Sequence, residues 1–127
     1  MKAIFIACGL ILAGALAWLL WPGPAGGDHF GLPYQGLPAV GIRDLSEHPA
    51  DFLKKDVRIS GPVVRQCPAA GCWFFVRGED GKEVKVEMGD TTPRLPQSMG
   101  MTATVEGRLI PFGNEHVFIG TGVEFRK

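Results

Sequence analysis

Two cysteines and a tryptophan, in the segment Cys67-Pro-Ala-Ala-Gly-Cys72-Trp73, are the residues whose types and spacing best suggest chemistry. Four residues separate the cysteines, and apolar, strand-like runs lie on both sides. A hairpin loop of that length places its flanking residues opposite each other, with Cα atoms roughly 4.5–5.5 Å apart, within the range of a disulfide. In an exported domain, the spacing therefore predicts a disulfide between Cys67 and Cys72.

Metal binding is the first alternative for the same two cysteines. Two thiolates are too few for a closed zinc site, which uses four ligands. His116 or a methionine (Met88, Met99 or Met101) could complete a set of soft sulfur and nitrogen donors, and such a set suits Cu(I). Our first expectation is that the protein has no cofactor. Copper is the alternative.

Thiol redox chemistry is the second alternative. A redox-active Cys-x-x-Cys pair has its thiol pKa lowered at a helix N-terminus. The longer spacing here, on a hairpin, provides no such helix. Catalysis of other kinds has little support, because the chain has no Ser/His/Asp arrangement, phosphate-binding glycine loop or HExxH motif. We expect no enzymatic activity and no catalytic residues.

Strands must position this segment, because five runs of alternating or continuous apolar residues follow residue 56. The runs are 57–63, 72–76, 84–88, 101–109 and 117–125. Glu79-Asp80-Gly81-Lys82 and Gly113-Asn114 are typical turns. Gly61 and Gly107 fall inside runs, as expected where a coiled strand turns the corner of a barrel. These features predict an all-β fold, a five-stranded barrel of OB type.

A short helix is expected to lead into the barrel, over residues 46–55. Ser46 suits its N-cap, Pro49 its first turn, and Lys54 and Lys55 its C-terminal end. The preceding residues 23–41 are rich in glycine and proline and show no strand or helix period, so we expect a linker there. The predicted domain boundaries are 1–22 for an anchor, 23–41 for the linker and 42–127 for the barrel.

An apolar run of 19 residues, 3–21, opens the chain. A helix of that length spans roughly 28 Å, close to the thickness of a bilayer core. Trp18 and Trp21 suit the interface, and Lys2 favours a cytoplasmic N-terminus. We therefore expect a single-pass anchor in the cytoplasmic membrane with the barrel in the periplasm, the alternative being a cleaved signal peptide at Ala15-Leu16-Ala17.

The stretch from residue 42 to 125 resembles the OB-fold superfamily, with a helix containing His-Pro-Ala-Asp-Phe followed by Lys-Asp-Val-Arg-Ile-Ser-Gly-Pro-Val. Through Cys67, Gly71, Cys72 and Trp73 it resembles exported bacterial OB-like proteins of unknown function that carry a Gly-Cys-Trp motif after the first strand. It is also similar to small periplasmic copper chaperones of OB type. Haem chaperones of cytochrome c maturation share the anchor and barrel but need a tyrosine four residues after a histidine, where Gly120 follows His116.

Charge composition argues against nucleic acid as the partner. The chain has 13 basic and 13 acidic residues with no basic block, so phosphate neutralisation has no obvious surface. Among binding functions, a protein partner in a membrane complex fits best, with the chain as an accessory subunit or binding module. Trp73, Phe74 and Tyr34 are the candidate interface residues, and the sequence leaves the direction of Trp73 open.

Overall fold

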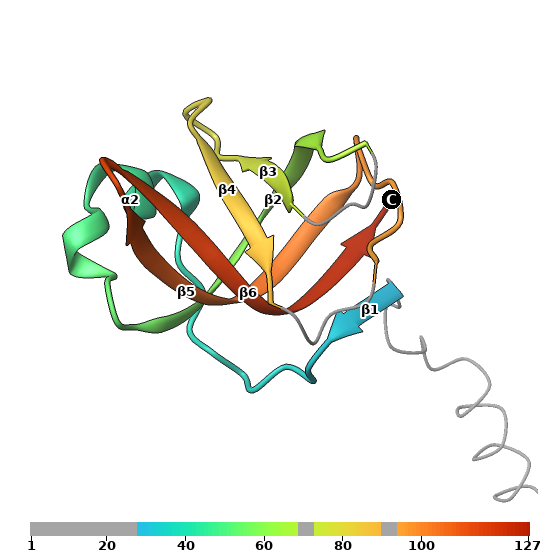
Figure 1. The fold of residues 1–127 in the computed structure, drawn as a ribbon, viewed down its shortest axis with the longest axis horizontal. Helices are drawn as coiled ribbons and strands as arrows, with labels where there is room; N and C mark the ends of the chain where they lie inside the picture. The colour runs from blue at the N-terminus through green and yellow to red at the C-terminus, as the bar shows by residue number, and fades with distance from the viewer. Residues whose placement is uncertain (1–27, 69–72, 90–93) are drawn as a thin grey trace, which may run out of the picture.

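The computed structural model describes residues 28–68, 73–89 and 94–127. These residues form six strands and two short helices, drawn in Figure 1. In chain order they are β1 (Asp28–Gly31), α2 (Ile42–Glu47), the 3-10 turn η1 (Pro49–Asp51), β2 (Asp56–Gln66), β3 (Trp73–Arg77), β4 (Glu83–Met88), β5 (Thr102–Phe112) and β6 (Glu115–Arg126).

Five of these strands close into a barrel. The order is β2-β3-β4-β6-β5, and β5 returns to pair with β2. Among the described strands β4 and β6 pair in parallel, whereas the other pairs are antiparallel. This closed, mostly β architecture with a short leading helix is consistent with the expected OB-type barrel, and the five predicted runs all became strands.

The barrel interior holds the apolar half of each alternating strand, as period-two patterning requires. Phe74, Phe118 and Phe125 are its largest fully buried side chains. The predicted turns join β3 to β4 and β5 to β6, with left-handed glycines at Gly81 and Gly113. Gly61 permits the close approach of β3, because a Cβ there would lie 2.6 Å from the carbonyl oxygen of Arg77.

The leading helix lies earlier than predicted. Its α-helical part begins at Ile42 rather than Ser46, because Ile42 and Leu45, three residues apart, both bury against the barrel. The helix stops before Pro49, since the residue preceding a proline is driven out of helical conformation. His48 has φ −128° and ψ 55°, and a single 3-10 turn follows instead of the expected helix through Lys55.

The expectation of a featureless linker over 23–41 was wrong for its described part. Residues 28–31 form β1, which pairs antiparallel with the last residues of β6. Residues 32–40, which we call the strap, then run across the barrel. The amides of Leu32 and Val40 donate to the carbonyl oxygens of Thr121 and Arg58, and the amide of Arg58 donates to the carbonyl oxygen of Pro38. This region therefore belongs to the folded domain.

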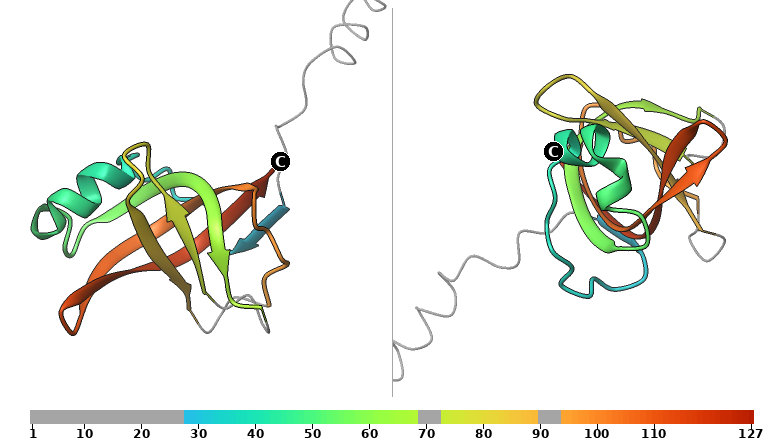
Figure 2. Two further views of the ribbon diagram at one scale, coloured as in Figure 1. Left: turned by 90° about the horizontal axis from the view of Figure 1, so that it is seen from above. Right: turned by 90° about the vertical axis from the view of Figure 1, so that its left-hand side faces the viewer.

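The barrel has two distinct ends, seen in two directions in Figure 2. The end that carries α2 and the β5–β6 hairpin is called the far end. The near end carries the start of β1, the end of β6 and the connection 94–101. In this described part of the chain no helix is long and apolar enough to cross a membrane; the predicted span 3–21 lies outside it.

Candidate functional site

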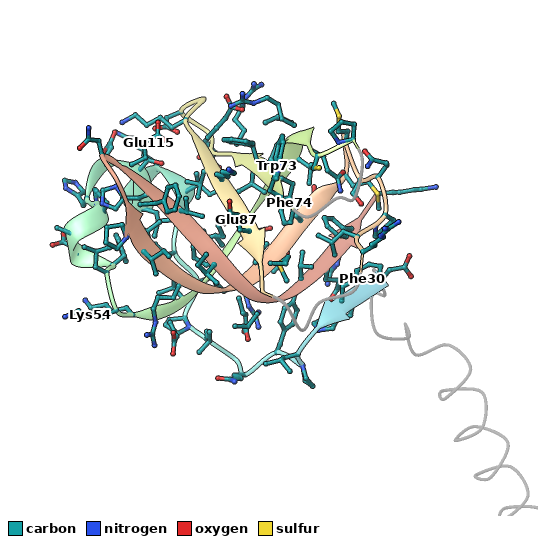
Figure 3. All side chains as sticks on the ribbon, viewed as in Figure 1. Phe30, Lys54, Trp73, Phe74, Glu87 and Glu115 are labelled. Carbon is teal, nitrogen blue, oxygen red and sulfur yellow. The ribbon has the colours of Figure 1, made fainter. Side chains whose placement is uncertain are left out.

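Two aromatic rings lie on the outer surface of β3. Trp73 and Phe75 alternate with the buried Phe74 and Val76, so their half-buried side chains point away from the core. Their ring centroids lie 5.7 Å apart in an edge-to-face arrangement. Figure 3 labels Trp73 and its buried neighbour Phe74 on β3. The direction of Trp73, which the sequence left open, is thus outward.

Cations from the neighbouring strands cover these rings. The guanidinium carbon of Arg65 on β2 lies 4.0 Å from the Phe75 centroid, and Lys85 Nζ on β4 lies 5.6 Å from the Trp73 centroid. Both distances allow a cation–π attraction. We call these four residues, Arg65, Trp73, Phe75 and Lys85, the aromatic face.

Carboxylates neutralise the cations of the aromatic face. Arg65 Nε lies 3.3 Å from Glu83 Oε1, and Lys85 Nζ lies 3.2 Å from Glu87 Oε1. Proteins that bind nucleic-acid strands use unpaired lysine and arginine side chains to neutralise the phosphates and release their counterions. A surface of paired charges around two rings suits instead the mixed aromatic and polar character of a protein interface.

A second polar cluster holds the strap to the barrel. The carboxylate of Glu106 is almost wholly buried, and it accepts hydrogen bonds from the strap amides of Gln35 at 2.6 Å and Leu37 at 3.0 Å. Arg58 donates to the same carboxylate through Nη2 at 2.7 Å and Nε at 3.2 Å. Burial raises the pKa of Glu106, but these hydrogen bonds outweigh it, and the pKa lies below its usual value.

Tyr34 completes this cluster. Its hydroxyl donates to the carbonyl oxygen of Thr104 at 2.7 Å, and Arg58 lies 4.7 Å above its ring. Burial, with the negative charge of Glu124 next in effect, raises the pKa of Tyr34 to about 12. The hydroxyl therefore stays a donor at ordinary pH. Tyr34, expected as an interface residue, fastens the strap to the barrel.

Tyr34→Phe is expected to lower the free energy of unfolding by about 1 kcal/mol, the net value of one hydrogen bond. Urea unfolding would measure the loss. Ser60→Ala is the matched control, because Ser60 contacts the side chain of the same Thr104 at 3.1 Å but is exposed. The control should change stability by less than about 0.5 kcal/mol. Equal losses in the two variants would contradict the role given to Tyr34.

A hollow with a volume of about 820 Å³ lies between α2, β2 and the β3–β4 turn. Arg43, Arg77, Glu79 and Asp80 supply its charged groups, two of each sign. The residues that line it include no histidine or cysteine. This hollow therefore offers charged groups of both signs and the hydroxyl of Ser60, which contacts Thr104 at 3.1 Å.

The predicted thiol pair is described only in part. Cys67 follows the end of β2, half-buried; its amide donates to the carbonyl oxygen of Trp73 at 3.1 Å, and its carbonyl accepts from Gln97 Nε2 at 3.0 Å. Cys72 lies outside the described residues. The Cys67–Cys72 disulfide stays a prediction.

The structure separates one member of the proposed metal set, His116, from Cys67. His116 is exposed at the start of β6 and pairs with Pro111 near the far end, whereas Cys67 lies at the near end. Met101 packs against the core beside Val63. Within the described ranges no three His, Cys, Asp or Glu side chains gather to hold a metal ion. Strand topology, which the spacing of residues in the sequence does not reveal, separates His116 from Cys67.

Phe74 was also misassigned. It was expected at an interface, but its ring is fully buried and packs on Phe125 at 5.5 Å between centroids. The run 72–76 is apolar on both faces, so its sequence did not distinguish inside from outside. Phe75, which that reasoning passed over, takes the outward position.

Comparison with known protein families gives no match, and a search of curated protein sequences finds no similar protein.

Proposed function

We propose that this protein is a membrane-anchored, partner-binding barrel of the periplasm, an accessory subunit of a membrane complex. The observation that carries the proposal is the aromatic face, two outward rings under paired charges. In OB barrels the second and third strands form the usual binding surface. These correspond to β3 and β4, which bear Trp73 and Lys85.

The chemistry of the aromatic face favours a polypeptide partner. Its two cations lie beside the carboxylates of Glu83 and Glu87, so this surface has no excess positive charge to attract a polyanion. Tryptophan and arginine are, in contrast, the residues that contribute most to protein interfaces. The partner expected here is a near-neutral polypeptide surface with aliphatic side chains that pack on the rings.

Trp73→Ala is expected to weaken partner binding about 30-fold or more, which is the effect of losing a hot-spot side chain. The full-length chain would be purified in mild detergent, and the stoichiometry of any co-purifying protein measured for wild type and variant. Phe112→Ala is the matched control, because Phe112 is a 69 % exposed aromatic residue at the far end. Thermal unfolding would check that both variants fold.

Two outcomes would contradict the proposal. A wild-type chain that is recovered alone as a monodisperse monomer would remove the partner. A co-purifying protein retained equally by Trp73→Ala and wild type would remove the aromatic face as its binding surface. Binding of an oligonucleotide with an affinity that falls steeply with salt would favour a nucleic-acid function instead.

A further inference from the structure

The chain enters the barrel at the near end. β1 runs antiparallel to β6, and its first residue, Asp28, pairs with Phe125 close to the end of β6. Figure 3 shows Phe30 of β1 on one side of the molecule, and Lys54 and Glu115 on the other. Whatever precedes Asp28 therefore approaches the barrel from the near end.

The tether to the predicted membrane span is short. Six residues, 22–27, separate Trp21 from Asp28. Fully extended, these seven steps reach at most about 25 Å. By comparison, the 12 residues of β6 run about 36 Å along the strand from the near end to the far end. Strands of a closed barrel tilt by about 35–45° from its axis, so β6 rises only about 26–29 Å along that axis. The tether would therefore have to be fully extended for the barrel to stand on the bilayer with its far end down, whereas the near end can face the bilayer without any extension.

The near end also presents an apolar side chain on a fixed turn. Met101 donates its amide to Ser98 at 3.0 Å, and Gly100 between them has φ +84°, so Met99 occupies the outer corner of a type II turn. Gln66 on β2 holds this turn by accepting a bond from the Ser98 amide at 2.7 Å. Met99 is consequently 60 % exposed although its neighbours are anchored.

We propose that the near end of the barrel faces the lipid surface, with Met99 in the headgroup region. The inference rests on the membrane anchoring in the proposed function and adds an orientation and a contact to it. An apolar side chain beside cations is the composition that binds an anionic bilayer interface. Arg94, in the segment that leads into the turn, and Lys127, which follows β6, are the exposed cations that contribute here. Arg126 at the same end is paired with Glu124, and Asp28 is the exposed acidic residue there.

This orientation also places the aromatic face. Trp73 begins β3, and its carbonyl oxygen accepts a hydrogen bond from Cys67 just beyond β2, so the ring lies toward the near end. A partner bound to Trp73 would therefore meet the barrel close to the bilayer. A membrane-embedded subunit satisfies that geometry.

Paramagnetic broadening of amide signals would test the orientation. The full-length chain would be placed in nanodiscs of phosphatidylcholine and phosphatidylglycerol that contain a gadolinium-chelate lipid. The amides of Gly100 and Arg126 should broaden several-fold more than those of Gly113 and Glu115 at the far end. Equal broadening at the two ends, or more at Gly113, would overturn the inference.

Met99→Glu tests the contact between Met99 and the lipid headgroups. One extra negative charge should reduce the ratio of docked to undocked barrel about fivefold at an anionic bilayer surface. Phe112→Glu is the control, because it places the same charge at the far end on an apolar residue that is 69 % exposed, compared with 60 % for Met99. A Met99→Glu spectrum as broadened as that of wild type would remove the Met99 contact.

The failures can be told apart. A chain that does not remain with the nanodiscs contradicts the anchoring, and the orientation falls with it. A chain that remains with the nanodiscs but broadens evenly contradicts the orientation alone.

Discussion

Glu106→Gln is expected to lower the free energy of unfolding by about 3 kcal/mol, the cost of breaking a buried, fully hydrogen-bonded ion pair. Glutamine keeps the shape of the side chain but turns one acceptor oxygen into a donor. Four donor groups converge on the carboxylate: the amides of Gln35 and Leu37 and two nitrogens of Arg58. At least one of these donors would lose its partner in a site that water hardly reaches.

Glu87→Gln is the matched control for this substitution. Glu87 also pairs with a cation, Lys85 at 3.2 Å on the same strand, but the two side chains are 44 % and 35 % exposed. Exposed pairs contribute little, so the control should cost less than about 0.5 kcal/mol. Urea unfolding of both variants would compare them, and losses of similar size would contradict the role of Glu106.

The pH dependence of the Glu106 effect follows from the direction of its pKa. Because the pKa in the folded protein lies below the ordinary value of 4.5, folding favours the ionised carboxylate. This stabilisation is complete above the ordinary pKa and is lost as the pH falls through the lowered, folded-state pKa. The stability gap between wild type and Glu106→Gln should therefore narrow below pH 4.5. A gap that is constant from neutral pH down through that range would argue against a charged Glu106.

The sequence predicted the barrel well because period-two alternation is a local signal. Val84 and Val86 alternate with Glu83 and Lys85, and the structure buries the first pair and leaves the second on the outer side. The turn chemistry of Gly81 and Gly113 is equally local, since each residue needs a left-handed φ. Strand existence and strand faces could therefore be read without knowing the partners.

What the sequence could not show depends on contacts between distant segments. Glu106 occupies a polar position in the alternating run of β5, as Thr104 and Arg108 do, and that pattern is typical of a solvated face. The strap nevertheless covers it from about 70 positions earlier in the chain. Likewise β1 has four residues and lies among glycines and prolines, so only its pairing with β6 defines it as a strand. Non-local strand pairing also separates His116 from Cys67, although the sequence alone was compatible with both residues binding one metal ion.

Gly107→Ala should lower the free energy of unfolding by about 3 kcal/mol or more, because the added Cβ would overlap the backbone of β6, which cannot move aside as a side chain can. Gly107 pairs with Gly120, where the register between β5 and β6 shifts by one residue. A Cβ at Gly107 would overlap the carbonyl oxygen of Ile119 and lie 2.9 Å from the Cα of Gly120. Relief of that overlap requires β5 and β6 to separate at the register shift.

Gly89→Ala is the control for the same change in side chain. Gly89 lies just after β4, its φ is not left-handed, and an added Cβ would meet nothing within 4 Å. That variant should be neutral or slightly more stable, because alanine restricts the unfolded chain. Thermal unfolding followed by circular dichroism would compare the two. A Gly107→Ala protein with the midpoint of wild type would mean that β5 and β6 do not approach each other as closely as the register shift requires.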